Sequence, residues 1–235
     1  MRWLNSLWRR RPVLDGAQAA ALAAYRSCRL PNLHAPLAER AVVVDVEASG
    51  LNPFQDRLIS VAGISVAGGL VRLNECFEAV LRQNQPSDDR NILVHGIGGS
   101  EQLAGREPAA GLIDFLEFAG KAPLVAFHAD FDRILIERAT SAVLGMKPGN
   151  VWLDLALLAP ALLTGPARTA RNLDDWTRIF GIENYSRHNA ASDALATAQL
   201  LLVVLAEANA RSLGTWAQLM SLQRDYRWLN SGARL

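Results

Sequence analysis

The chain has 235 residues, half of them hydrophobic, so a folded globular protein with one sizeable core is expected. Its 24 Lys and Arg residues nearly balance 23 Asp and Glu residues, which gives a formal net charge of +1. This balance excludes a global basic field of the kind that drives non-specific nucleic-acid binding, so any nucleic acid must be held locally.

Cysteine usage and the length of the apolar runs indicate a soluble protein of the cytoplasm. Cys28 and Cys76 are far apart and lack the spacing of a zinc site or a redox pair, which favours reduced thiols. The N-terminus lacks the apolar segment of a signal peptide. The longest apolar run, at 200–206, is far shorter than the roughly 20 residues of a membrane span. We therefore expect no membrane association.

The first 40 residues predict a helical N-terminal extension, because residues 17–29 are rich in alanine and are followed by Pro31. From residue 41 the pattern changes to the apolar, β-branched runs that are typical of buried strands. Gly68-Gly69 fits a tight turn between two of these runs. Three strands joined as a meander are expected, at 41–46, 58–66 and 70–80.

After a polar loop at 84–90, short apolar strands alternate with helical periodicity. Strands are expected at 124–127 and 151–153. Helices are expected at 108–119, 131–144, 173–180, 192–211 and 215–228. Paired strands followed by strands that alternate with helices indicate an α/β architecture, a mixed sheet covered by helices. We divide the chain into the extension (1–40), one domain (41–211) and a C-terminal helical segment (212–235).

Two acids interrupt the first strand in the sequence VVVDVE. Because side chains alternate across a strand, Asp45 and Glu47 should face the same side, near the strand end where open α/β sheets place ligands. Two adjacent carboxylates in an apolar setting repel each other, and a hard divalent cation such as Mg²⁺ or Mn²⁺ would compensate them. The alternative is that Glu47 already lies in the following loop and Asp45 caps a turn.

Two further acids and a histidine could complete such a site. Asp132 follows the strand expected at 124–127, so its side chain should emerge at the same edge of the sheet. Asp193 opens the helix expected at 192–211, and its alternative role is to stabilise the helix N-terminus. His188 is either a surface residue or, within a carboxylate cluster, a base that accepts a proton from an attacking water.

Three segments in this order resemble the DnaQ-like 3′–5′ exonucleases, the DEDDh family, which includes the proofreading epsilon subunit of bacterial DNA polymerase III. They are DVEASGLNP at 45–53, LVAFHADFDRILI at 124–136 and HNAASDA at 188–194. A fourth segment, NILVHGIGG at 91–99, is similar to the family's H-G-I-T segment. The resemblance runs from about residue 41 to about residue 211.

The resemblance implies a ribonuclease-H-like fold, with a mixed five-stranded sheet flanked by helices. It also implies two divalent metal ions, Mg²⁺ or Mn²⁺, held by four acids, with a histidine as general base. The acids are Asp45, Glu47, Asp132 and Asp193, and the base is His188. The related tyrosine branch of the family has Tyr where this chain has Asn189, so the histidine branch is favoured.

Substrate contacts are implied at Ser49, Gly50, Leu51, His128 and Phe131. Ser49 replaces the second threonine of a family pair and keeps a hydroxyl that could contact a phosphate or sugar, whereas Ala48 cannot. Leu51 would pack on the terminal base or, alternatively, belong to the core. His128 falls where the family commonly has Asn, so the substrate contact at this point should differ from that of the proofreading subunit.

The function that the resemblance implies is release of nucleoside 5′-monophosphates from the 3′ end of single-stranded or frayed DNA. The same five residues would serve an exoribonuclease or oligoribonuclease, because recognition of the 2′-hydroxyl depends on pocket shape. A hypothesis from a different class is a non-catalytic nucleotide-binding interaction module. The complete acid set favours catalysis.

Tryptophans lie near both ends of the chain, at Trp3, Trp8, Trp216 and Trp228. They could mark an interface with a polymerase, with another protein or with a second copy in a homodimer, because Trp is enriched at interaction hot spots. Alternatively, they pack terminal helices onto the domain. The run Arg9-Arg10-Arg11 is either a solvated face or a small nucleic-acid patch.

Overall fold

The predicted three-strand meander is present in the computed structural model, which describes residues 14–165 and 169–231. The antiparallel strands are β1 (Ala41–Ala48), β2 (Leu58–Ala67) and β3 (Leu70–Val80). Gly68 and Gly69 form the β2–β3 turn with φ angles of 63° and 74°. Glycine adopts this left-handed conformation without the steric cost of a Cβ atom.

Two short parallel strands complete the sheet on the other side of β1. β4 (Leu124–Ala126) pairs with β1, and β5 (Trp152–Asp154) pairs with β4. The strand order is β3-β2-β1-β4-β5. The predicted mixed five-stranded sheet is therefore confirmed, with β1 at its centre.

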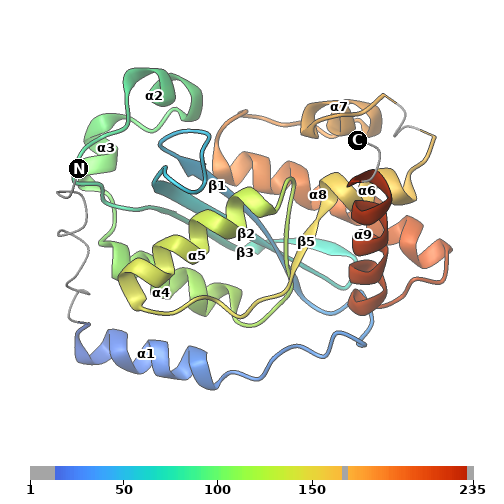
Figure 1. Cartoon of the computed structure of the whole chain (residues 1–235), viewed down its shortest axis with the longest axis horizontal. Helices are drawn as coiled ribbons and strands as arrows, with labels where there is room; N and C mark the ends of the chain where they lie inside the picture. The colour runs from blue at the N-terminus through green and yellow to red at the C-terminus, as the bar shows by residue number, and fades with distance from the viewer. Residues whose placement is uncertain (1–13, 166–168, 232–235) are drawn as a thin grey trace.

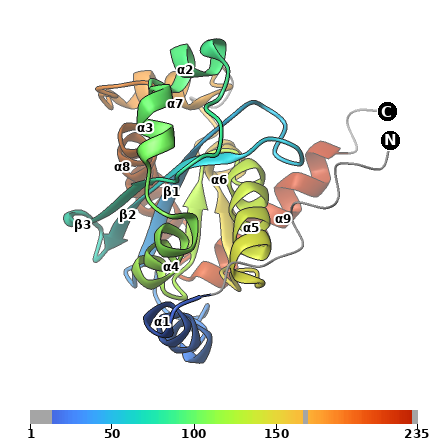
Figure 2. The same ribbon diagram turned by 90° about the vertical axis from the view of Figure 1, so that its left-hand side faces the viewer.

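Helices cover both faces of the sheet (Figures 1 and 2). In chain order they are α1 (Gly16–Ser27), α2 (Asp89–His95), α3 (Gly99–Ala104), α4 (Pro108–Ala119), α5 (Asp130–Leu144), α6 (Leu155–Leu162), α7 (Leu173–Phe180), α8 (Ala190–Ala210) and α9 (Trp216–Ser231). The helix at the N-terminal side, α1, confirms the predicted helix at 17–29. The sequence does not predict α2, α3 or α6.

The three unpredicted helices are very short or lack a polar face, so their helical periodicity is weak. α2 and α3 have 7 and 6 residues, and α2 begins at Asp89, inside the segment predicted to be a polar loop. α6 has 8 residues, is apolar on almost every side and contains Pro160, a residue that normally ends a helix. These helices are stabilised by tertiary packing and, for two of them, by capping. Side-chain oxygens of Asp88 and Asp154 cap the N-termini of α2 and α6.

The alternation of side chains along β1 divides the core in two. Val42 and Val44 pack with residues of α1, α4 and α5 on one face. Ala41 and Val43 pack with residues of α6, α7, α8 and α9 on the other. The period of two therefore determines which helices each side chain of β1 meets, and Asp45 belongs to the α8 face.

The C-terminal helix α9 packs against α6 and β5, and Trp216 at its start is buried. For Trp216 the prediction of packing onto the domain is confirmed. Trp228, near the other end of α9, is 75% exposed. Trp3, Trp8 and the run Arg9-Arg10-Arg11 lie outside the described residues.

The central helix α8 is apolar because it crosses the core. Among the described residues it is the one helix whose length and composition would allow a membrane span. Here it contacts β1, β2 and β3, and 56% of its most apolar window is buried inside the fold. Cys28 and Cys76 are both exposed free thiols, in agreement with the sequence prediction.

Candidate active site

Asp45 and Glu47 lie inside β1, on the face that turns toward α8. In the ladder with β2, Asp45 lies opposite Ala62 and Glu47 lies opposite Ser60. The alternative in which Glu47 belongs to the following loop is therefore wrong. The pairing shifts its register directly after Glu47, at the end of the strand.

Asp193 and Asp132 join these two acids at the same edge of the sheet. Asp193 lies in the first turn of α8, and one oxygen each from Asp45, Glu47 and Asp193 can be chosen so that all three lie within 4.8 Å of one another. Asp132 is buried in the first turn of α5 and is hydrogen-bonded to the backbone of Val46. The fold thus brings together the four acids that the sequence singled out.

Burial dominates the electrostatics of these acids. It raises the pKa of Asp45 well above its usual value, and the charges of Asp132, Asp193 and Glu47 raise it further. Burial and then the charge of Asp193 raise the pKa of Glu47 to about 8. Such a cluster holds protons at neutral pH unless a cation compensates it. Its all-carboxylate oxygen donors suit hard divalent cations such as Mg²⁺ or Mn²⁺.

Asn189, and not Asp193, is the N-cap of α8. The Asn189 side chain accepts a hydrogen bond from the backbone N–H of Ser192 at 3.0 Å. The Asp193 carboxylate instead accepts one from the backbone N–H of His188, at 3.0 Å on Oδ2, and one from Arg187 on Oδ1. Asp193 therefore ties the loop that precedes α8 to the acid cluster, which the capping alternative does not explain.

His188 lies on the loop 182–189, directly before α8. Its φ angle of 59° is in the left-handed region, which is uncommon for residues other than glycine. His188 is exposed and lines a cleft of about 410 Å³ together with Ser60 and Arg187. Ser60 lies opposite Glu47 on the sheet, so this cleft begins one strand away from the acids, although none of the four acids lines it.

Sequence reasoning missed Asp154 and Arg187. Asp154 ends β5, is buried, and accepts a hydrogen bond from the backbone N–H of His128 at 2.9 Å. Burial raises the pKa of Asp132 most, and the charge of Asp154 adds to the rise. Asp132 is singled out in the sequence because it is an acid that follows a short apolar strand. The same criterion would have identified Asp154. Nothing in the sequence around Arg187 indicates its partners.

The loop after β1 holds three of the predicted substrate contacts. The Ser49 hydroxyl accepts a hydrogen bond from the Arg57 backbone N–H at 2.9 Å and donates one to Asp56 at 3.2 Å, so it closes its own loop. A Cβ atom at Gly50 would lie 2.6 Å from Asp56 Oδ2, which explains the glycine. Leu51 is 92% exposed, so the alternative in which it belongs to the core is wrong.

The other two predicted contacts lie at the start of α5, beside Asp132. His128 is exposed and has a φ angle of 64°, and its backbone N–H donates a hydrogen bond to the Asp154 side chain. Phe131 is half-buried and packs against the core of α4 and α5. Contact of either residue with a substrate stays a prediction.

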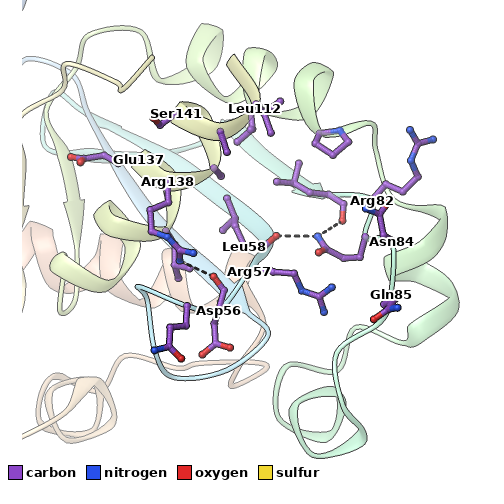
Figure 3. A pocket seen from close by; sticks show the side chains of 18 of the residues that line it. Asp56, Arg57, Leu58, Arg82, Asn84, Gln85, Leu112, Glu137, Arg138 and Ser141 are labelled. Carbon is purple, nitrogen blue, oxygen red and sulfur yellow. Dashed lines mark hydrogen bonds between the residues drawn. The ribbon is translucent and has the colours of Figure 1, made fainter. Parts of the chain in front are cut away.

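A larger cleft of about 890 Å³ lies on the α4–α5 side of the sheet (Figure 3). Arg57, Arg82 and Arg138 are among the residues that line it, and Arg138 donates a hydrogen bond to the backbone carbonyl of Asp56 at 2.8 Å. None of the described residues that line it belongs to the acid cluster. Neither cleft is lined by an acid of the cluster, so the carboxylates themselves, and not a cleft, mark the candidate site.

Comparison with known proteins identifies the family of the chain. The family model described as exonuclease, of the RNase T type, matches residues 42–201. The DNA polymerase III subunit epsilon-like protein of Rhodobacter capsulatus is 31% identical over 190 residues, which are 79% of this chain and 26% of that protein. The DNA polymerase III subunit epsilon of Aquifex aeolicus is 27% identical over 71% of this chain and 80% of that protein.

Two solved structures show the same fold. Exonuclease I of E. coli in complex with a dT13 oligonucleotide superposes with a TM-score of 0.64 and 19% identity, over 73% of this chain and 42% of that one. Exonuclease X in complex with a 5′-overhanging duplex DNA superposes with a TM-score of 0.61 and 18% identity, over 78% of this chain and 99% of that one. The chain therefore belongs to the RNase T-type exonuclease family, and its predicted resemblance to the DnaQ-like exonucleases is confirmed.

Proposed function

We propose that the chain is a metal-dependent 3′–5′ exonuclease that releases nucleoside 5′-monophosphates from single-stranded or frayed DNA. The observation that carries the proposal is the group of three carboxylates, Asp45, Glu47 and Asp193, whose oxygens lie within 4.8 Å of one another. Three partly desolvated acids at this spacing cost free energy in a metal-free protein, so they need a function that offsets the cost.

The four acids would hold two divalent ions, Mg²⁺ or Mn²⁺. Asp45 is central to the cluster, because its pKa is raised by the charges of three other acids, Asp132, Asp193 and Glu47. When bound, such ions supply Lewis acidity that favours ionisation of water and stabilises the leaving 3′ oxygen. Asp45 would bridge the ions, Glu47 and Asp193 would hold the first, and Asp132 would support the second.

His188 would act as the general base, accepting at an imidazole nitrogen the proton of the attacking water. Its exposed position on the 410 Å³ cleft allows contact with both solvent and substrate. Its backbone bond to Asp193 keeps it next to the acid cluster. On the substrate side, Ser49, Gly50, Leu51, His128 and Phe131 would contact the terminal nucleotides.

DNA is the preferred polymer in this proposal. The relatives named above are DNA polymerase III subunits or similar to them, and two structural neighbours hold DNA oligonucleotides. An association with a polymerase or another protein, a homodimer and a cytoplasmic location remain predictions. An exoribonuclease would use the same acids, so the substrate must be decided by experiment.

The test is a substrate panel with product analysis. DNA and RNA single strands of equal length, labelled at either end, are incubated with the protein and Mn²⁺ or Mg²⁺, with chelator as the control. We expect stepwise shortening from the 3′ end, nucleoside 5′-monophosphate as the product, faster cleavage of DNA and no cleavage with chelator. Products that carry a 3′-phosphate, or shortening from the 5′ end, would contradict the proposal.

A further inference from the structure

Arg187 lies on the loop 182–189, between α7 and α8, and pairs with two carboxylates from different helices. We propose that Arg187 is a positioning residue: by bridging Asp174 and Asp193 it holds His188 beside the acid cluster. This inference rests on the proposed function, in which His188 is the general base.

The two ion pairs use different parts of one guanidinium group. Nε of Arg187 lies 2.6 Å from Asp174 Oδ1, and Nη1 lies 2.7 Å from Asp193 Oδ1. The planar guanidinium can donate to two carboxylates at once with fixed geometry, whereas a lysine ammonium is a point charge on a flexible stem. Asp193 is almost fully buried and the arginine side chain is 35% exposed, so solvent screens the pair with Asp193 only partly.

The bridge restrains a strained backbone. His188 has a φ angle of 59°, a conformation that persists only when the surrounding structure holds it in place. Its N–H donates to Asp193 Oδ2, so Arg187 and His188 bind the two oxygens of the same carboxylate. The same loop is also hydrogen-bonded to α8 at Ser186, whose N–H donates to Ser192 Oγ at 3.0 Å. The loop is thus held by polar side chains of α8.

α7 supplies the rigid end of the bridge. Its residues Leu173 and Trp176 are buried, and the Trp176 ring stacks on Phe180. The Asn172 side chain caps its N-terminus. Asp174 stands on the first turn of this anchored helix and is partly exposed, outside the acid cluster. It therefore offers a way to loosen the loop without changing a metal-binding acid.

Arg187 also acts on the acids through its charge. Its guanidinium lies 2.7 Å from the Asp193 carboxylate, which belongs to the group of three acids. The same residue thus supplies positive charge to the cluster and a mechanical link to α7. Outer partners of metal-binding carboxylates commonly have both effects, and their loss costs about 10–100-fold in affinity or activity.

The first experiment compares Asp174→Asn with Asp175→Asn. Asp175 is the matched control, because it lies in the same helical turn and pairs with Arg178 instead of Arg187. For Asp174→Asn we expect kcat to fall about tenfold with little change in KM, as for loss of an outer partner. Amide hydrogen exchange in peptides that cover 182–189 should become faster. Asp175→Asn should leave both measurements unchanged.

The second experiment is a double-mutant cycle with Arg187→Lys. Lysine can keep a charge near Asp193 but cannot span both carboxylates, so its loss of kcat should match that of Asp174→Asn. Because both changes break one bridge, the double variant should lose no more than either single variant. Additive losses, or a wild-type kcat with unchanged exchange in Asp174→Asn, would overturn the inference.

Hydrogen exchange separates this inference from the proposed function. If the wild-type protein cleaves no nucleic acid, the proposed function fails, yet exchange in the 182–189 peptides still reports whether Asp174 holds the loop. If the wild-type protein is active and exchange in Asp174→Asn is unchanged, only the positioning role of Arg187 fails.

Discussion

On β1, Asp45 and Glu47 are fixed by backbone pairing with β2, in a strand that also pairs with β4 near its start, whereas on the loop 182–189 His188 is fixed by a hydrogen bond to a side chain. The strand is further held by Val42 and Val44, which are fully buried. Substitutions on β1 should therefore change the chemistry and leave the positions intact. Substitutions on the loop should also move the residues that remain.

The largest effect is expected on the strand, for Asp45→Asn. Release of mononucleotides should fall below detection, because the residue is shared by the whole acid cluster. The melting temperature of the metal-free protein should nevertheless rise, because the amide removes a buried carboxylate that burial and its neighbours disfavour in ionised form. Activity assays and thermal unfolding with chelator at about pH 7.5 check both outcomes.

Glu75→Gln is the matched control for that variant. Glu75 also lies on a strand, β3, but it is exposed and its nearest cation, Arg40, is 3.8 Å away. It should keep wild-type activity and stability. An Asp45→Asn protein that unfolds in chelator at a much lower temperature than the wild type would mean that β1 does not hold its acids rigidly.

A smaller effect is expected on the loop, for His188→Ala. Removal of a general base should lower kcat about 10²–10⁴-fold, while the four acids remain to bind metal. Calorimetric titration with Mn²⁺ should give the wild-type stoichiometry. Loss of metal binding would make His188 a ligand, and unchanged turnover would show that another group accepts the proton.

The same contrast explains how much of the site could be predicted from the sequence. The acids of β1 are visible because a period of two is a local property of the chain, and Asp132 is visible because it follows a buried strand. The bridge from Asp174 through Arg187 to Asp193 depends on how α7 packs against α8, which no local pattern encodes. α2 and α3 are equally hidden because they are too short to show a helical period, and α6 is hidden because it has no polar face and contains Pro160.

The smallest expected effect is a pH dependence of stability that originates on β1. The pKa of Glu47 is about 8 in the folded, metal-free protein and about 4.5 in its unfolded form, so between these values the folded state holds a proton that the unfolded state has lost. Stability without metal should therefore fall as pH rises through this window, by up to about 1.4 kcal/mol per pH unit for one proton. A bound divalent cation favours the ionised acid, so the gain in melting temperature on adding Mn²⁺ should increase from about pH 5.5 to about pH 7.5.

Glu47→Gln should flatten the dependence of metal-free stability on pH, because an amide does not titrate, while Glu75→Gln should leave this dependence unchanged. A wild-type melting temperature in chelator that rises across this range would mean that the acids of β1 are compensated without metal, and the contrast between strand and loop would then need another physical basis.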